Sequence, residues 1–207
     1  MKRRALLLTA LLTACGRRKA AMTLVLPAGS VALALGDSIT HGTGAAPEAA
    51  YPAQLAQLSG WNVINGGVPG DTSAQALARL PALLSEYKPA LVIVSLGGND
   101  FLRRLPEADT EANLRRCVAL SRDADAQVVL VAVPRPTLAA AIGVGLSDHP
   151  LYEKVAASLA LPLHAGGWAR VLSDEKLRSD QIHANAEGYR VFAEALVTTL
   201  RAAGLLR

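Results

Sequence analysis

Short apolar runs alternate along this chain with longer stretches of helical periodicity, and this alternation constrains the fold more than any other feature. The runs that we read as β-strands are Val31–Leu35, Trp61–Asn65, Ala90–Leu96, Gln127–Val133 and Leu161–His164. The stretches that we read as helices are Glu48–Ser59, Ser73–Tyr87, Thr110–Ala124, Pro150–Leu159 and Asn185–Ala203. Strands that alternate with helices form right-handed crossovers and a parallel sheet covered on both faces. The sequence therefore predicts an α/β fold, a three-layer α/β/α sandwich.

Length and charge indicate a single folded domain that does not bind nucleic acid. A chain of 207 residues is long enough for one well-buried core, and we expect that domain to span residues 30–207. Three of the 21 basic residues lie at positions 2–4, and without them 18 basic residues face 17 acidic ones. A nearly neutral domain argues against binding driven by phosphate contacts.

The amino-terminal residues are typical of an export signal. Basic residues at positions 2–4 precede an apolar stretch over 5–12, which is too short to span a bilayer. The stretch ends in Leu-Thr-Ala-Cys, with Cys15 last, and this string resembles the bacterial lipobox. The resemblance implies a signal peptide over 1–15 and a lipid anchor on Cys15.

An exported, lipid-anchored protein on the periplasmic side of a membrane is therefore expected, with residues 16–29 as a connector. Gly16 stands where an inner-membrane retention signal often has Asp, which favours the outer membrane if the source is Gram-negative. The alternative is an ordinary signal peptide cleaved near Ala20-Ala21, in which Cys15 has no role.

The remaining cysteine and the histidines predict neither a disulfide framework nor a metal site. Cys117 has helical spacing with Leu114, and we expect it to be a small buried apolar residue. The four histidines are scattered without the spacing of metal ligands: His41, His149, His164 and His183. We expect no metal and no cofactor.

Four short polar strings carry the chemistry that the sequence offers. They are Gly36-Asp37-Ser38, Gly70-Asp71-Thr72, Gly97-Gly98-Asn99-Asp100 and Asp180-Gln181-Ile182-His183. The first three follow predicted strands, and the carboxyl ends of parallel strands meet at one edge of a sheet. The fourth precedes the last predicted helix, in a loop that a sandwich can bring to the same edge. Each string alone is weak evidence, but their agreement in type and order predicts a serine esterase site.

These strings resemble the conserved blocks of the GDSL or SGNH hydrolase family, in its thioesterase I, lysophospholipase and arylesterase branch. The similarity runs over about 31–200 and includes the stretch 65–84, with its Leu-Ala-Arg-Leu-Pro-Ala-Leu-Leu string. This resemblance implies a flavodoxin-like parallel five-stranded sheet in the order 2-1-3-4-5 and an open substrate groove.

The catalytic roles follow from side-chain chemistry and from the resemblance. Ser38 would be the nucleophile, at a turn from strand to helix, and His183 the base. Asp180 can reach the other ring nitrogen of His183 and orient it, although Asp174 and Glu175 are alternative acids. We expect a groove-lining or structural role for the last nearby candidate, His41, because its short tether to the nucleophile gives poor geometry for a base.

Three donors would form the oxyanion hole: the N–H groups of Ser38 and Gly70 and the side-chain amide of Asn99. Gly70 could instead be a plain turn glycine and Asn99 an Asx-turn residue. The residue before Gly70 is Pro69, where the family often has a small residue, and Pro69 has no N–H to donate. Ala184 follows the predicted base where Pro is frequent. We expect Asp37 and Asp100 to brace these loops.

The substrate would contact Phe101, Leu102 and the segment 134–149, where Pro136 and Ile142 are candidate contacts. That segment could equally be a surface helix without substrate contact. We expect hydrolysis of a small-molecule carboxylic ester or thioester through an acyl-serine intermediate. The alternatives are an O-acetylesterase acting on cell-envelope polysaccharide or peptidoglycan and a non-catalytic acyl-binding lipoprotein. The sequence indicates no oligomeric state.

Overall fold

The computed structural model describes residues 24–135 and 145–207, which fold around one parallel sheet. Its strands are β1 (Val31–Gly36), β2 (Asn62–Gly67), β3 (Leu91–Ser95), β4 (Gln127–Val131) and β5 (Leu163–His164). The strand order is β2-β1-β3-β4-β5, and every neighbouring pair is parallel. The predicted sheet and its order are confirmed.

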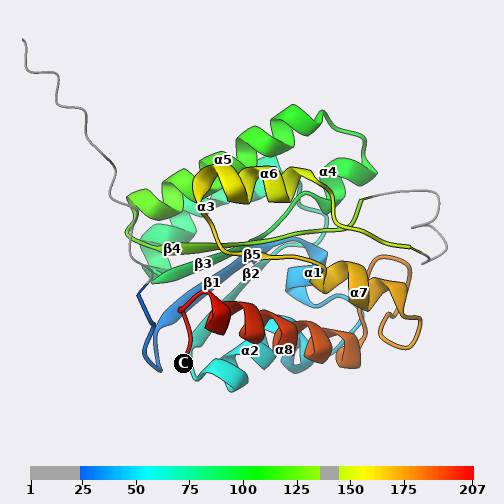
Figure 1. Ribbon diagram of the computed structural model, residues 1–207, viewed down its shortest axis with the longest axis horizontal. Coiled ribbons are helices and arrows are strands. Elements are labelled where there is room, and N and C mark those ends of the chain that lie inside the picture. Colours follow the sequence, from blue (N-terminus) through cyan, green and yellow to red (C-terminus); the bar gives the residue numbers. More distant parts are fainter. Residues whose placement is uncertain (1–23, 136–144) are drawn as a thin grey trace, which may run out of the picture.

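Helices cover both faces of the sheet, so the predicted three layers are also confirmed (Figure 1). One layer holds α3 (Ser73–Tyr87), α5 (Glu107–Asp123) and α6 (Leu151–Leu159), and the other holds α2 (Tyr51–Ser59) and α8 (Ala186–Ala202). The shorter elements are α1 (Ser38–His41), the 3₁₀ helix η1 (Pro47–Ala49), α4 (Gly98–Leu102) and α7 (Gly167–Ser173). The carboxyl ends of the strands point toward α1, α4 and α7.

The core consists of apolar strands packed under these helices. Every residue of β3 is buried, as expected for a central strand with helices on both faces. Below the sheet, Trp168 of α7 stacks on Phe192 of α8 with ring centroids 3.5 Å apart, and Tyr51 contacts both rings edge-on. This aromatic cluster fixes α7 against α8 and so positions the loop between them.

Local sequence signals set the helix boundaries. The Asn185 side chain accepts a 3.0 Å hydrogen bond from the Gly188 N–H at the start of α8, as the predicted cap requires. Thr72 and Gln75 form a reciprocal capping box at the start of α3. Cys117 is buried in α5, as predicted, and burial raises the pKa of its thiol to about 12.

The structure corrects the prediction of one helix over Glu48–Ser59. The chain forms η1, then an extended residue at Ala50, and only then α2. The ring of Pro52 would clash with the carbonyl of Glu48 in a continuous helix, which explains the break. Three further helices, α1, α4 and α7, were not predicted, because four to seven residues are too few for a periodic signal.

The first described residues lie at the amino ends of the strands. The Leu24 N–H donates to the Gln127 side chain at 2.9 Å, and the Leu26 N–H donates to the Leu205 carbonyl at 2.9 Å.

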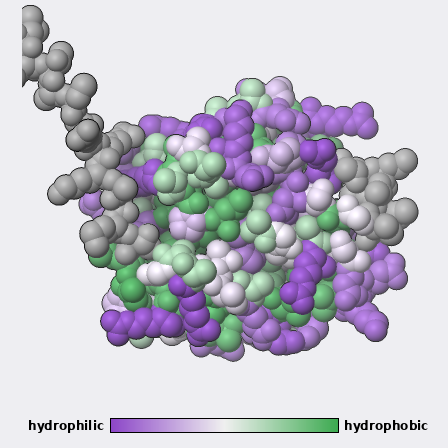
Figure 2. Space-filling model, in the orientation of Figure 1, coloured by the Kyte–Doolittle hydropathy of each residue, from purple (hydrophilic) through white to green (hydrophobic). Residues whose placement is uncertain are grey.

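Over the face viewed in Figure 1, hydrophobic and hydrophilic side chains are interspersed (Figure 2). Within 24–135 and 145–207, no helix has both the length and the apolar composition that crossing a bilayer requires.

Candidate active site

Ser38 lies at the carboxyl end of β1, where the chain turns into α1. The side chain of the preceding residue, Asp37, caps this helix by accepting a 3.1 Å hydrogen bond from the Ile39 N–H. Gly36 allows the turn, because a Cβ at that position would lie 1.9 Å from the Thr40 hydroxyl oxygen. Strand, glycine and cap together place the Ser38 hydroxyl at the edge of the sheet.

The structure brings His183 to Ser38 and Asp180 to His183. The His183 Nε2 atom lies 2.9 Å from the Ser38 Oγ atom, and Nδ1 lies 2.8 Å from the Asp180 Oδ2 atom. The other Asp180 oxygen accepts hydrogen bonds from the N–H groups of Ile182 and His183, both at 2.8 Å. This is the arrangement in which a carboxylate orients an imidazole toward a serine hydroxyl.

The hydrogen bonds around Asp180 keep its carboxylate ionised. Partial burial alone would raise its pKa, but the His183 ring and the two backbone N–H groups outweigh that effect. The pKa of Asp180 is therefore lowered below its usual value. An ionised Asp180 can stabilise the positive charge that forms on His183 when it accepts a proton.

The other acids and the nearby histidine have different partners. Asp174 accepts a 2.9 Å hydrogen bond from the Lys176 N–H, and Glu175 pairs with Arg178 at 2.8 Å. His41 is exposed on α1, and its carbonyl oxygen accepts a 3.2 Å hydrogen bond from the Asn65 side chain. The structure thus brings Asp180, and neither of the alternative acids, to His183.

Asn99 of α4 lines a cavity together with Ser38, and its amide contacts the loop that carries Gly70. Gly70 has a φ of +83°, a conformation that strongly favours glycine. The Asn99 amide donates to the Asp71 carbonyl at 3.0 Å and to the Asp37 carboxylate at 3.3 Å. In the part of the chain that the structure describes, the N–H groups of Ser38 and Gly70 donate to no protein atom. These two N–H groups are thus open to an anionic oxygen.

Two buried aspartates hold these loops together. Asp100 accepts hydrogen bonds from the Ser73 N–H at 2.8 Å and the Ser73 hydroxyl at 2.5 Å. Asp37 links α1 to Asn99, and burial, the largest effect on this group, raises the pKa of Asp37 to about 6. Neither carboxylate contacts His183 or the Ser38 hydroxyl, which agrees with the bracing role predicted for both.

Comparison with known proteins places this site in a family. The model of the GDSL-like Lipase/Acylhydrolase family matches residues 34–191, a range that contains all four polar strings. The chain belongs to this family. It is therefore a GDSL-type serine hydrolase, as the sequence predicted.

Two curated relatives and one solved structure illustrate the similarity. Thioesterase 1/protease 1/lysophospholipase L1 of Escherichia coli (strain K12) is 34% identical over 174 residues, 82% of each chain. The arylesterase of Vibrio mimicus is 32% identical over 176 residues, 81% of this chain and 86% of the relative. A crystal structure of TesA is 30% identical with a TM-score of 0.72, covering 84% of this chain and 99% of that chain.

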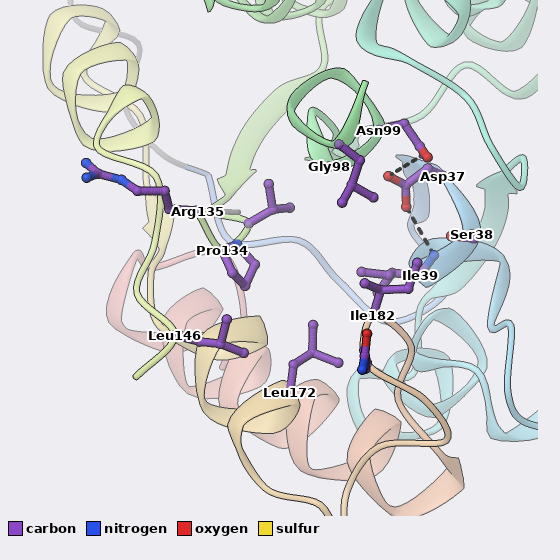
Figure 3. A pocket seen from close by; sticks show the side chains of 13 residues that line it. Asp37, Ser38, Ile39, Gly98, Asn99, Pro134, Arg135, Leu146, Leu172 and Ile182 are labelled. Carbon is purple, nitrogen blue, oxygen red and sulfur yellow. Dashed lines mark hydrogen bonds between the residues drawn. The ribbon is translucent and has the colours of Figure 1, made fainter. Parts of the chain in front are cut away.

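A cavity of about 240 Å³ opens beside the Ser38 side chain of this hydrolase. Its polar end is formed by Asp37, Ser38 and Asn99, and the other side is mostly apolar (Figure 3). The apolar lining residues are Ile39, Leu102, Val133, Pro134, Leu146, Leu172 and Ile182. Such a surface complements a hydrocarbon chain better than a sugar.

The predicted substrate contacts are placed in different ways. Leu102 lines the cavity. Phe101 does not line it: its ring is buried and stacks on His149 with centroids 4.2 Å apart. Pro136 and Ile142 lie outside the described residues.

Sequence reasoning missed several residues of the cavity wall. Leu172 belongs to α7, a helix that was not predicted, and Ile39 belongs to α1. Ile182 was visible as an apolar residue between Asp180 and His183, and its side chain is 44% exposed. An exposed isoleucine within a polar catalytic string is a signal that could have indicated a substrate contact.

Proposed function

We propose that this protein hydrolyses carboxylic esters or thioesters of apolar acyl groups through an acyl-Ser38 intermediate. The observation that carries this proposal is the continuous contact from Asp180 through His183 to Ser38, at 2.8 and 2.9 Å, beside an apolar cavity. The relatives named thioesterase, lysophospholipase and arylesterase support the same class of substrate.

In the first half-reaction, the Ser38 oxygen attacks the carbonyl carbon of the substrate while His183 Nε2 takes the hydroxyl proton. The Asp180 carboxylate stabilises the resulting imidazolium through Nδ1. The carbonyl oxygen becomes an oxyanion that accepts hydrogen bonds from the N–H groups of Ser38 and Gly70 and from the Asn99 amide. Of the two contacts of that amide, the longer one to Asp37 is the one that the oxyanion would replace.

The intermediate then collapses, and the bond from the carbonyl carbon to the leaving oxygen or sulfur breaks. His183 gives its proton to the leaving group, which departs as an alcohol or thiol. In the second half-reaction, His183 takes a proton from water, and the resulting hydroxide equivalent attacks the acyl-Ser38 carbonyl. The bond from the carbonyl carbon to the Ser38 oxygen then breaks, His183 returns its proton to that oxygen, and the carboxylic acid leaves.

The acyl group would lie along the apolar side of the cavity, against Leu146, Leu172 and Ile182. Moving a CH₂ group from water into such an apolar environment contributes about 0.8 kcal/mol to the binding free energy. Each added carbon that fits therefore improves binding severalfold. This preference favours esters and thioesters of longer acyl groups over acetylated polysaccharide, because seven of the lining side chains are apolar, whereas Arg135 and Gln181 are the polar ones outside the catalytic end.

Hydrolysis of p-nitrophenyl esters from acetate to palmitate tests the proposal, with labelling by a fluorophosphonate as the second measurement. We expect turnover and labelling in the wild type and loss of both in Ser38→Ala. Ser173→Ala is the matched control, because the Ser173 hydroxyl donates only to the Ala169 carbonyl within α7 and contacts none of the proposed catalytic residues. A folded wild type that neither turns over nor labels would support the acyl-binding alternative.

We also propose that the protein is exported and attached to a membrane by lipid on Cys15. The support is the string over 12–15, together with the basic residues at 2–4 and the apolar stretch over 5–12 that precede it. All of these positions lie outside the described residues. The outer membrane is favoured in a Gram-negative source because Gly16 follows the cysteine. Incorporation of labelled palmitate tests this proposal, since Cys15→Ala should abolish it, whereas Cys117→Ala should not.

A further inference from the structure

The loop that carries Gly70 is fastened by side chains from the segment after β3. The Asn99 amide donates to the Asp71 carbonyl at 3.0 Å, and Asp100 accepts from the N–H and the hydroxyl of Ser73. A third contact comes from Arg103, whose Nη2 atom donates to the Gly70 carbonyl at 2.8 Å. The carbonyl of the candidate oxyanion residue therefore has a charged partner of its own.

Arg103 reaches this carbonyl because of its helical spacing from Asn99. Residues four apart share a face of a helix, and the Arg103 N–H donates to the Asn99 carbonyl at 3.0 Å. Asn99 and Arg103 are thus directed at adjacent carbonyl groups of one loop, those of Asp71 and Gly70. A single turn of chain contributes one oxyanion donor and supports the residue that contributes another.

Gly70 needs such support because glycine has the widest conformational freedom of any residue. Its N–H direction depends on the rotation about the bonds of its own Cα. The Gly70 N–H belongs to the peptide unit between Pro69 and Gly70, at the centre of the turn that the Asp71 N–H closes by donating to the Val68 carbonyl at 3.1 Å. The next peptide unit is held at both ends, by this hydrogen bond and by Arg103, which donates to the Gly70 oxygen. Only the two rotations at the Gly70 Cα, with φ at +83°, separate this fixed unit from the one that bears the N–H, so the Arg103 contact restricts the direction of the Gly70 N–H.

We propose that Arg103 is a positioning residue for the oxyanion hole, which acts by fixing the Gly70 peptide and does not touch the substrate's acyl group. This inference rests on the proposed function of Gly70 as a donor. Arg103 is exposed and does not line the cavity beside Ser38, so it contributes neither to the packing of the core nor to the apolar side of the cavity. Its removal should leave the fold intact and the Gly70 N–H less well aligned.

Arg104 offers a matched control. It is the next residue, it carries the same charge, and it is also exposed. Its side chain makes no hydrogen bond or ion pair with any residue in the ranges 24–135 and 145–207. Arg103→Ala and Arg104→Ala therefore change the net charge equally at nearly the same place, and only the first removes the contact with Gly70.

The kinetic test uses a neutral p-nitrophenyl ester and the full chain. We expect kcat to fall about 10- to 100-fold in Arg103→Ala with KM changed less than about 2-fold, because misalignment weakens transition-state contacts and not ground-state binding. Arg104→Ala should keep the wild-type kcat. Added methylguanidinium should restore part of the kcat of Arg103→Ala and leave Arg104→Ala unchanged.

Equal kcat values in the two variants would overturn the proposal, and so would a change confined to KM. Relaxation of the Gly70 amide ¹⁵N nucleus provides a readout that does not depend on turnover. We expect greater mobility of this amide in Arg103→Ala than in Arg104→Ala. If the wild type fails to hydrolyse esters, the proposed function fails, and the mobility of Gly70 still decides whether Arg103 positions it.

Discussion

Replacing Asn99 by alanine separates the oxyanion contribution of its amide from its structural contacts. The amide donates to the Asp71 carbonyl at 3.0 Å and to the Asp37 carboxylate at 3.3 Å. In the proposed mechanism, the second of these hydrogen bonds passes to the oxyanion in the transition state. Asn99→Ala therefore removes one of three donors to the developing charge and one partner of a backbone carbonyl.

The expected effect on catalysis is much larger than the effect on stability. Loss of one oxyanion donor lowers kcat by about 10²- to 10³-fold, which corresponds to about 3–4 kcal/mol of transition-state stabilisation. Loss of the hydrogen bond to the Asp71 carbonyl costs about 1 kcal/mol of folding free energy. KM should change little, because the substrate carbonyl bears no full charge in the ground state.

Asn113→Ala is the control for this experiment. The Asn113 amide donates to the Ser73 hydroxyl at 2.9 Å, so it supports the same loop but is not a member of the proposed oxyanion hole. We expect Asn113→Ala to lose a similar amount of stability in urea unfolding and less than about 3-fold in kcat. A loss of kcat in Asn99→Ala no greater than in Asn113→Ala would refute the role of Asn99 as a donor.

Three further predictions concern other parts of the site. Asp180→Asn should lower kcat by about 10⁴-fold in steady-state ester hydrolysis, because the amide cannot stabilise the His183 imidazolium, whereas Asp174→Asn should leave kcat unchanged. Burial raises the pKa of Asp37 from 3.8 to about 6, so the folded state binds this proton more tightly than the unfolded state does. Ionisation of Asp37 therefore lowers the free energy of unfolding as the pH rises through this range. Urea unfolding should show Asp37→Asn gaining about 2 kcal/mol relative to the wild type between pH 4 and pH 7, and a constant difference would contradict this cause. Leu146→Phe should narrow the cavity and lower kcat/KM for octanoate relative to acetate esters, and an unchanged ratio would show that the acyl chain lies elsewhere.

The apolar strand patterns predict most of the fold because the central strands are buried on both faces. Four successive apolar residues before Ser95 predict β3, and similar apolar runs predict β1 and β4. The short helices α1, α4 and α7 gave no periodic signal, and the break before α2 depended on Pro52. The missed helices matter most at the cavity, where α7 supplies Leu172.

The order of the polar strings predicts where the candidate site lies. Ser38, Gly70 and Asn99 each follow a strand, and the sheet rule brings such positions together. The contact between Arg103 and Gly70 could not be predicted, because it depends on the side-chain direction of one residue at the end of a five-residue helix. The wall residues Leu172 and Ile182 likewise depend on how loops fold back over the sheet.

The two ends of the described chain meet on the side of the molecule away from the catalytic groups. The Leu26 N–H donates to the Leu205 carbonyl at 2.9 Å, at the amino ends of the strands, whereas Ser38 follows the carboxyl end of β1. A resin, a fused domain or a membrane attached at either end of the described chain would therefore lie on the side of the molecule opposite the cavity. Attachment near Leu24 or at the carboxyl terminus therefore holds the enzyme with Ser38 facing away from the support, which leaves the approach of the substrate open.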